Sequence, residues 1–425
     1  MKIAVIHQNF PGQFRHLCAH LAQRADVQLV AIGHESAPGM PGVALRRYTL
    51  HRKPTEGVHH YVVGFERAVL YGQAVARELH DLKAKGFEPD VVIAHPGWGE
   101  ALLVKDVFPH TRLINFCEYY YRAEGADADF DPAHPLRFDD RARITTRNAL
   151  HLLNLELCDV GVAPTAWQRS LHPHAYRHKI HTLHEGIDIA GLAPDPAARM
   201  ELPNGTVVRA GDEVITYVAR NLEPYRGFPS FMSALPAVLQ ARPNAQVLIV
   251  GGDEVSYGSK PKGHASWREA MLAELDLPEA LLARVHFLGK LAYPDYKRVL
   301  QLSAAHVYLT YPFVLSWSML EAMASGCLVI GSATAPVQEV IRDGQNGVLV
   351  DFFDVPGIAA RVIAALTHPE RFAPLRVAGR ALVRERYPLA AGVRGYLDLI
   401  GLPQPRRELA KGRAAAVKAA KMPVV

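Results

Sequence analysis

Residues Tyr311 to Ile330 have the sequence YPFVLSWSMLEAMASGCLVI, and this segment is the most informative about the fold. Its pattern predicts a strand end, a tight loop, a short helix from about Ser318 to Ala324, and a further strand. A helix N-terminus presents unpaired N–H groups and a partial positive charge, so this loop is a candidate anion site. Glu321 lies one turn inside the helix, where its carboxylate can accept hydrogen bonds from hydroxyl groups. Amides for a phosphate and a carboxylate for a diol suit a nucleotide-sugar; the alternative is an ordinary strand–helix–strand unit with a solvated Glu321.

The composition is that of a globular protein with two or three domains. The chain has 425 residues, 49% hydrophobic and 21% charged, which argues against disorder. Its net charge of +5 is too small to indicate a nucleic-acid partner. The N-terminus has the pattern of a strand and not of a signal peptide, and no run of about 18 apolar residues is present to span a membrane. We expect a cytoplasmic protein, peripheral at most to the inner face of the membrane.

The cysteines and histidines show no spacing typical of a metal site. The four cysteines lack a C-x-x-C pair, which favours buried thiols in a reducing compartment. The 21 histidines cluster at 59–60 and 172–184, but without the spacing of a zinc enzyme. The sequence therefore predicts neither a metal nor a cofactor.

Short apolar runs alternate with helical patterns in the first half of the chain, which predicts βαβ units and a parallel sheet. We expect strands at 2–6, 27–32, 91–94, 112–116, 160–163 and 179–183. The apolar residues Phe14, Leu17, Cys18 and Leu21 mark one face of a helix after the first strand. Ligands of such sheets bind at the carboxyl ends of the strands, so the loops there are the candidate sites.

Two of these loops carry candidate site residues. The loop from His7 to Gln13 contains Gly12, which permits close approach of the backbone to a ligand; an ordinary turn glycine is the alternative. The strand at 112–116 is followed by Glu118 and three tyrosines. An acid beside aromatic rings suits a bound sugar. The alternative is a packed aromatic cluster with a salt bridge to Arg122.

A Pro- and Ala-rich stretch with a turn at Asn204-Gly205 separates the two halves and predicts a linker over 191–212. Strands are expected again at 214–218, 246–250, 285–288, 306–309, 328–330 and 348–350. Ser266 and Glu269 form a capping-box pattern that opens one of the intervening helices. We therefore predict an α/β protein with two doubly wound, Rossmann-like domains facing each other across a cleft.

Two arginines follow the first strand of the second half. Arg220 ends that strand and Arg226 lies in the next loop. Guanidinium groups stay charged and match phosphate oxygens, so this pair can neutralise a leaving diphosphate without a metal. The alternative is a surface pair bridged to Glu223. Gly252, after the next strand, permits another close backbone approach, and the polar segment 254–265 is either a mobile flap or a surface loop.

The string VARNLEPYRGF at 218–228 resembles the strand–Arg–loop–Lys/Arg–Gly signature of family 4 glycosyltransferases with the GT-B fold. The FLG at 287–289 and the sequence from Tyr308 to Val350 are similar to the rest of that family's donor domain. The resemblance is strong over 215–351. Before residue 190 it is weaker, where the E-G-I-D at 185–188 resembles the family's N-G-V-D.

The resemblance implies a role for each candidate residue. Arg220 and Arg226 would bind the donor diphosphate, Glu321 would hold the ribose, and Glu118 would lie near the acceptor. Backbone amides would contact the sugar and the diphosphate from five residues: Val314, Leu315, Ser316, Trp317 and Ser318. Gly12 and Gly252 complete the expected donor contacts.

The resemblance also implies an activity. A metal-independent, hexosyltransferase-like enzyme would move a sugar from a nucleotide-sugar to a glycan or lipid-linked acceptor, with retention, in polysaccharide or glycoconjugate biosynthesis. One position departs from the family: the first acid of the E-x7-E motif, which commonly contacts a hydroxyl of the transferred sugar, is Phe313 here. Two alternatives therefore stay open, a nucleotide-sugar epimerase on the same fold and a non-catalytic nucleotide-sugar- or carbohydrate-binding protein.

The linker divides the chain into an acceptor-side domain over 1–190 and a nucleotide-sugar-binding domain over 213–385. A helical pattern from Leu382 to Leu399 is broken at Pro388, and it predicts a helix over 386–402 that returns to the first domain. Residues 403–425 are basic and alanine-rich. They are expected to form a flexible tail, with weak attraction to an anionic membrane surface.

Overall fold

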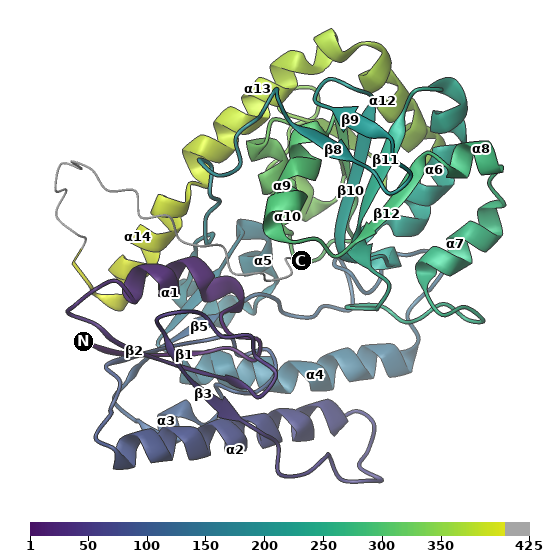
Figure 1. Cartoon of the computed structure of the whole chain (residues 1–425). Coiled ribbons are helices and arrows are strands. Elements are labelled where there is room, and N and C mark those ends of the chain that lie inside the picture. Colours follow the sequence, from purple (N-terminus) through teal and green to yellow (C-terminus); the bar gives the residue numbers. More distant parts are fainter. Residues whose placement is uncertain (404–425) are drawn as a thin grey trace, which may run out of the picture. The chain divides into compact units, whose positions relative to one another are not determined.

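The structure is a computed structural model of the whole chain, of which residues 1–403 are described (Figure 1). Its described residues divide into two compact units, one of residues 1–186 and 389–403 and the other of Ile187–Pro388. The backbone N–H of Ile187 donates to the Tyr387 carbonyl at 2.8 Å. The segments that lead into and out of the second unit therefore lie side by side.

The first unit contains a seven-stranded, parallel sheet in the order β3-β2-β1-β4-β5-β6-β7. Its strands are β1 (Lys2–Ile6), β2 (Gln28–His34), β3 (Ala44–Tyr48), β4 (Val91–Ala94), β5 (Arg112–Phe116), β6 (Val160–Ala163) and β7 (Ile180–Thr182). Its helices are η1 (Gly12–Phe14), α1 (Arg15–Leu21), α2 (Val63–Ala84), α3 (Val104–Val107), α4 (Phe138–Leu157), α5 (Ala166–Leu171), η2 (His174–Lys179) and α14 (Leu389–Ile400). The strands expected from the sequence are all present, while β3 was not predicted.

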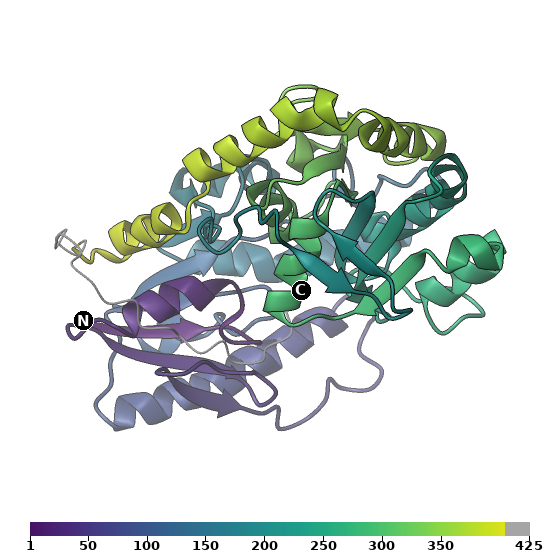
Figure 2. The same ribbon diagram turned by 45° about the horizontal axis from the view of Figure 1, so that its top comes forward.

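Successive side chains of a strand point to opposite faces of the sheet, and they are therefore buried in two different hydrophobic cores. Ile3 and Val5 of β1 pack with α1 and α14, whereas Ala4 and Ile6 pack with α2 and α3. Figures 1 and 2 show these helices on opposite faces of the sheet. The apolar face predicted for the first helix, with Leu17, Cys18 and Leu21, is buried in the α1 and α14 core.

The second unit contains a six-stranded, parallel sheet in the order β12-β11-β10-β13-β14-β15. Its strands are β10 (Val214–Asn221), β11 (Gln246–Gly252), β12 (Val285–Gly289), β13 (Ala305–Tyr308), β14 (Leu328–Ser332) and β15 (Val348–Val350). Its helices are η3 (Pro224–Arg226), α6 (Phe228–Ala241), α7 (Trp267–Leu275), α8 (Glu279–Leu282), α9 (Tyr293–Leu302), α10 (Trp317–Ala324), α11 (Ala335–Gln338), α12 (Val355–Thr367) and α13 (Pro369–Arg386). Two α/β units with parallel sheets match the predicted fold class. The Ser266 hydroxyl accepts from the Glu269 N–H and caps α7, as predicted.

The segment 191–212, expected to be a linker, is instead folded onto the second unit. It contains an antiparallel hairpin of β8 (Arg199–Glu201) and β9 (Val207–Arg209) around the Asn204-Gly205 turn. Leu192, Leu202 and Val208 are buried in the core of that unit. The turn was recognised, but each strand is only three residues long, too short to show an alternating pattern.

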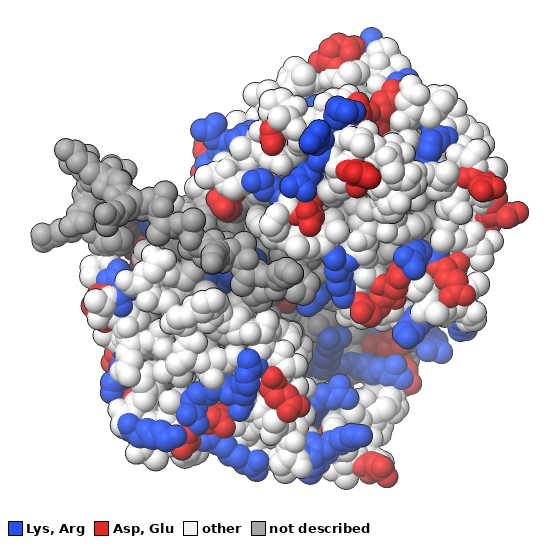
Figure 3. Space-filling model, viewed as in Figure 1, with Lys and Arg blue, Asp and Glu red and all other residues white. Residues whose placement is uncertain are grey.

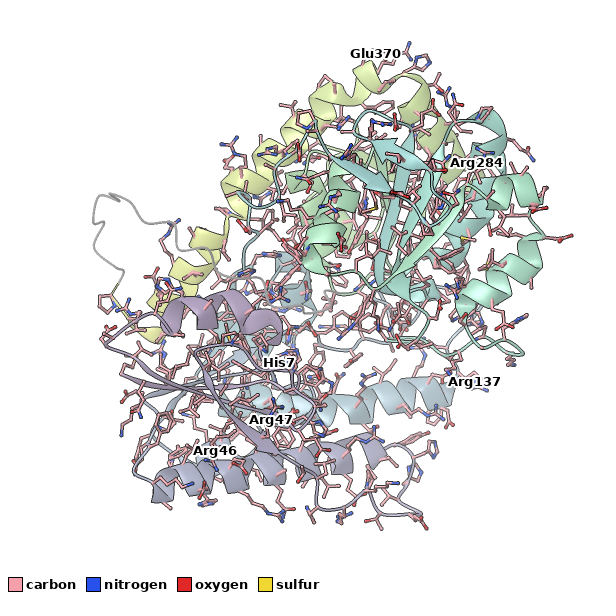
Figure 4. All side chains as sticks on the ribbon, viewed as in Figure 1. His7, Arg46, Arg47, Arg137, Arg284 and Glu370 are labelled. Atoms are coloured by element: carbon pink, nitrogen blue, oxygen red, sulfur yellow. The ribbon has the colours of Figure 1, made fainter. Side chains whose placement is uncertain are left out.

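The surface carries both signs of charge. On the face shown in Figure 3, basic and acidic side chains are interspersed, in line with the small net charge. Arg46 of β3, labelled in Figure 4, pairs with Glu78 of α2 at 2.8 Å.

All four cysteines are buried free thiols, as predicted. Among residues 1–403, no helix is long and apolar enough to cross a bilayer. The tail predicted at 403–425 lies outside the described residues, apart from Pro403.

We predict that Gly227→Ala destabilises the second unit by about 2 to 4 kcal/mol. Gly227 joins η3 to α6 with a φ of +68°, and an added Cβ would lie 2.3 Å from the Leu309 Cβ. Urea unfolding of wild type and variant measures the difference. The control is Gly263→Ala, at a φ of +79° in open space, which should cost only about 1 to 2 kcal/mol of backbone strain. Equal losses in both variants would contradict the predicted clash.

Candidate functional site

Parallel pairing places the carboxyl ends of β10, β11, β13 and β14 at one edge of the second sheet. Arg220 and Gly252 lie at the ends of β10 and β11, and the loop from Leu309 to Ser316 joins β13 to α10. Apart from Gly12, which lies in the first unit, the predicted donor-binding residues belong to these loops and to the start of α10. The structure therefore brings these candidates to a single edge of the sheet.

Arg226 is a buried cation at this edge. Its side chain is held by the Thr310 hydroxyl and the Val314 carbonyl, to which Nη1 donates at 2.8 and 2.9 Å. The guanidinium lies over the Tyr257 ring, 5.4 Å from its centroid, and the residue is only 8% exposed. Within residues 1–403, Arg226 forms no salt bridge with a carboxylate. Because a buried charge without a counter-ion is costly, this position is suited to an anion.

Arg220 differs from Arg226 in its exposure. It lies near the end of β10 between the buried Ala219 and Asn221, and its own side chain is exposed. It makes no side-chain hydrogen bond or ion pair in the described part of the chain. The predicted alternative, two surface arginines bridged to Glu223, is wrong, because Arg226 is buried and no such bridge forms within residues 1–403.

The helix of the 311–330 stretch is α10, which begins one residue before the predicted start. The Ser316 hydroxyl caps it by accepting from the Ser318 N–H at 3.3 Å. The Ser316 N–H donates to the Tyr308 hydroxyl at 2.8 Å. Two of the amides expected to face a ligand are therefore used within the protein. The Val314 and Leu315 amides have no backbone or side-chain acceptor among the described residues, and so they fit that role better.

Glu321 lies inside α10 and is 6% exposed. The Tyr296 hydroxyl of α9 donates to its Oε2 at 2.6 Å, and burial raises the pKa of Tyr296 well above its ordinary value. The alternative of a solvated Glu321 is therefore wrong. Tyr296 fixes the orientation of the carboxylate. It was not identified from the sequence, because its partner lies 25 residues further along the chain.

Phe313 belongs to an aromatic cluster beside Arg226. Its ring is 5.5 Å from that of Tyr225 and 4.8 Å from that of Tyr257, both edge to face, and Tyr225 stacks on Tyr311 at 4.7 Å. Phe313 is 6% exposed. The aromatic residue that replaces an acid of the family motif is thus fully packed by its neighbours.

Glu223 is a second buried acid of this region, and the sequence did not identify its role. It is 0% exposed, and its carboxylate accepts from the consecutive N–H groups of Ser256, Tyr257 and Gly258 at 3.0 to 3.3 Å. Gly252 is crowded, because an added Cβ would lie 2.5 Å from Lys290 Cε and 2.6 Å from Asn221 Oδ1. The start of the predicted flap at 254–265 is therefore anchored.

In the first unit, a chain of hydrogen bonds converges on Glu118. Gln13 Nε2 donates to Glu118 Oε1 at 2.8 Å, and His95 Nε2 lies 3.3 Å from Oε2. His7, labelled in Figure 4, has its Nε2 2.6 Å from Gln13 Oε1. His7 and His95 directly follow β1 and β4, and Glu118 follows β5, so neighbouring strand ends bring them together. The predicted bridge to Arg122 is not formed, since Arg122 donates to the Leu171 carbonyl.

Backbone amides set the tautomers of both histidines. The Asn9 N–H donates to His7 Nδ1 and the Gly97 N–H donates to His95 Nδ1, which leaves the protons on Nε2. Burial raises the pKa of Glu118, but the hydrogen bonds from His95 and Gln13 and the Coulombic interactions with His95 and His7 together outweigh it, so that the net pKa lies below its ordinary value. Glu118 is therefore an oriented carboxylate. His95 was not predicted because it stands alone in the sequence, whereas only the clustered histidines drew attention as a possible metal site.

The other predicted features of this unit have mainly packing roles. Gly12 has a φ of +47°, and an added Cβ would lie 2.3 Å from the His7 ring, so glycine is needed to form the His7 and Gln13 pair. Tyr119 is buried and donates to Asp127 at 2.8 Å, while Tyr121 accepts from Arg147. Trp98 stacks on His95 of the Glu118 network, with ring centroids 4.3 Å apart. Among residues 1–403, no group of three His, Cys, Asp or Glu side chains is arranged to hold a metal ion.

Two protein-family models match the chain. The model described as "Glycosyl transferase family 4 group" matches residues 25–192, and "Glycosyl transferases group 1" matches residues 212–368. The GDP-mannose-dependent alpha-(1-6)-phosphatidylinositol monomannoside mannosyltransferase of Mycolicibacterium smegmatis is 28% identical over 197 residues, 46% of this chain and 49% of that protein. The phosphatidyl-myo-inositol mannosyltransferase of Mycobacterium leprae is 27% identical over 295 residues, 63% of this chain and 68% of that protein. The chain spans about half the length of the first of these relatives.

Solved structures share the fold at low sequence identity. Sucrose-phosphate synthase from Thermosynechococcus elongatus has a TM-score of 0.69 at 17% identity, covering 94% of this chain and 98% of that one. HepE from Anabaena, in complex with UDP-glucose, has a TM-score of 0.68 at 16% identity, covering 94% and 99%. These similarities establish the fold.

We predict that ionised Glu118 stabilises the first unit at neutral pH. Its folded-state pKa lies below the ordinary value of 4.5, so the stabilisation is present above pH 4.5 and is lost as the pH falls through the folded-state value. Urea unfolding of wild type and Glu118→Gln should give a difference in unfolding free energy that is larger at pH 7 than below pH 4.5. A difference that does not change with pH would contradict the ionised state of Glu118.

Proposed function

The chain belongs to family 4 of the glycosyltransferases, with the GT-B fold, and on this premise we propose that it transfers a sugar from a nucleotide-sugar to a hydroxyl of a glycan or lipid-linked acceptor. The donor would bind to the second unit and the acceptor hydroxyl to the first. The product would belong to polysaccharide or glycoconjugate biosynthesis.

The buried cation Arg226 is the observation that carries this proposal. It is held by neutral oxygens and a tyrosine ring, and no described carboxylate compensates its charge. A donor diphosphate would supply the missing counter-charge, with the exposed Arg220 adding a second guanidinium. Glu321, oriented by Tyr296, would accept hydrogen bonds from the ribose hydroxyls.

In the proposed reaction the bond between the anomeric carbon and the diphosphate oxygen breaks, and a bond to the acceptor oxygen forms. Negative charge accumulates on the diphosphate, where Arg220, Arg226 and the N-terminal end of α10 would stabilise it. The departing phosphate oxygen would take the acceptor proton, and the anomeric configuration would be retained. The arginines supply the positive charge, so we propose that transfer needs no metal. If the configuration were inverted, Glu118 would be the candidate base.

Glu118 and its neighbours support an acceptor site that binds hydroxyl groups. The oriented carboxylate can accept a hydroxyl proton, and Trp98 beside His95 offers an aromatic ring for the apolar face of a sugar or cyclitol. The relatives named above include phosphatidylinositol mannosyltransferases. We therefore favour an acceptor linked to a lipid, reached from the cytoplasmic side by peripheral contact with the membrane.

Phe313 favours a second candidate function, a non-catalytic protein that binds a nucleotide-sugar. The family's acid is absent at this position, and the aromatic cluster occupies the space. This candidate predicts a donor that binds but is neither hydrolysed nor transferred to any acceptor. Transfer of a labelled sugar to a lipid extract distinguishes the two functions.

We predict that Arg226→Ala and Arg220→Ala each weaken donor binding by about 10- to 100-fold, because each loses charged hydrogen bonds to the diphosphate. Calorimetry with UDP-, GDP- and ADP-sugars measures the affinities and identifies the nucleobase of the donor. Arg226→Lys should fall between wild type and Arg226→Ala, since lysine keeps the charge without the fork.

The control for this experiment is Arg361→Ala, which removes an exposed guanidinium from α12 and should leave the affinity unchanged. Wild type that binds none of the three donors would overturn the proposed function. NMR of the product then decides between retention and inversion.

A further inference from the structure

We propose that Glu223 is a positioning residue of the donor site: by holding the backbone of residues 256–258, it places the Tyr257 ring on the Arg226 guanidinium. This inference rests on the proposed function, because it concerns the group that would bind the diphosphate. It also assigns a role to the segment 254–265, which the sequence described only as a flap or a surface loop.

The carboxylate of Glu223 is fully buried and is held entirely by backbone dipoles in the described chain. Tyr257 N–H and Gly258 N–H both donate to Oε2 at 3.0 Å, and Ser256 N–H lies 3.2 and 3.3 Å from the two oxygens. Three consecutive N–H groups around one carboxylate fix the backbone path of this segment. Removal of the carboxylate leaves these donors without their acceptor.

The anchored segment carries the ring that covers Arg226. Tyr257 N–H donates to Glu223, and the Tyr257 ring is 5.4 Å from Arg226 Cζ and 4.8 Å from the Phe313 ring. Tyr257 itself is 39% exposed, so its far side faces solvent. The guanidinium thus has an aromatic ring as a neighbour in addition to the two oxygens that accept from Nη1.

The rest of the segment has weaker ties. The Asn221 side-chain amide lies 2.8 Å from Ser256 Oγ, and Trp267 Nε1 donates to the Ser259 carbonyl at 2.9 Å. Glu254 pairs with Lys290 at 2.6 Å, but this pair is exposed and contributes little. Glu223 is the only fully buried group among these anchors.

The position of Tyr257 affects anion binding through the local dielectric. A ring that excludes water from one face of Arg226 strengthens the attraction between the guanidinium and a phosphate. Without the anchor, the segment would sample other conformations and Arg226 would become hydrated. Donor affinity would fall although every residue that touches the donor is still present.

The first test measures how firmly the backbone of residues 256–258 is held and how well the Arg226 guanidinium is protected from a reagent. Wild type, Glu223→Ala, Tyr257→Ala and Glu254→Ala are compared by hydrogen exchange of the amides of 256–258 and by the rate at which phenylglyoxal modifies Arg226. Glu223→Ala should accelerate both by about tenfold or more. Tyr257→Ala should accelerate only the modification of Arg226. The control Glu254→Ala, on the same segment, should change neither.

The second test measures the affinities of the same proteins for UDP, GDP and ADP by calorimetry. Glu223→Ala and Tyr257→Ala should each lose about tenfold for the nucleotide that wild type binds, while Glu254→Ala should match wild type. Glu223→Ala that binds like wild type despite faster exchange would overturn the positioning role, as would unchanged exchange and modification rates. If Glu223→Ala does not fold, the result for Tyr257→Ala decides whether the proposal stands. An unchanged nucleotide affinity and an unchanged rate of Arg226 modification in Tyr257→Ala would refute the role of the ring. If wild type binds none of these nucleotides, the proposed function is wrong and the exchange and modification rates alone decide the role of Glu223.

Discussion

Parallel pairing of the strands is the constraint on which both candidate sites depend. In a parallel sheet the carboxyl ends of all strands lie at the same edge. Residues that follow neighbouring strands therefore meet there, even when they are far apart in the sequence. His7, His95 and Glu118 meet because β1, β4 and β5 are neighbours in the first sheet. Arg226 reaches the Thr310 and Val314 oxygens because β10 pairs with β13. The site residues thus follow from strand order, and the helices serve mainly to cover the faces.

Two opposite charges lie three residues apart at the end of β10, and yet they do not neutralise each other. Glu223 is held by three backbone N–H groups, and Arg226 is held by a hydroxyl, a carbonyl and a ring. If the two side chains were paired, the carboxylate would compete with a phosphate for the guanidinium. Separate neutral partners keep each charge buried and leave the charge of Arg226 available. This separation is a more specific feature of the site than the presence of the arginines alone.

The sequence predicted much of the fold and named several residues of the candidate sites, but it did not predict the contacts that orient them. Twelve strands and the bounds of α10 could be predicted from apolar runs. A parallel sheet is buried on both faces, so its strands are continuous apolar stretches of sequence. The strand β3 has the sequence ALRRY and was missed because, at the sheet edge, it carries Arg46, which pairs with α2. The residues that orient others, such as Tyr296, His95 and Glu223, could not be found by spacing. Their roles depend on partners at least 20 residues away in the sequence. His95 alone could have been proposed from its position, because it directly follows the predicted strand at 91–94 and ligands bind at the carboxyl ends of parallel strands.

The replacement of an acid by Phe313 is better understood from its surroundings than from the motif. In a site where Arg226 already lacks a carboxylate partner among the described residues, a further acid at 313 would lie close to the cation and offset part of its charge. The aromatic ring instead packs against Tyr225 and Tyr257, and Tyr257 in turn covers the guanidinium. Phe313 thereby supports the ring that keeps water from Arg226, and it leaves the net charge near the cation more positive. In the proposed reaction, a site of this kind would favour the phosphates of a donor over the hydroxyl groups of its sugar. The substitution would then shift recognition toward the diphosphate, and other residues would recognise the hydroxyl groups of the transferred sugar.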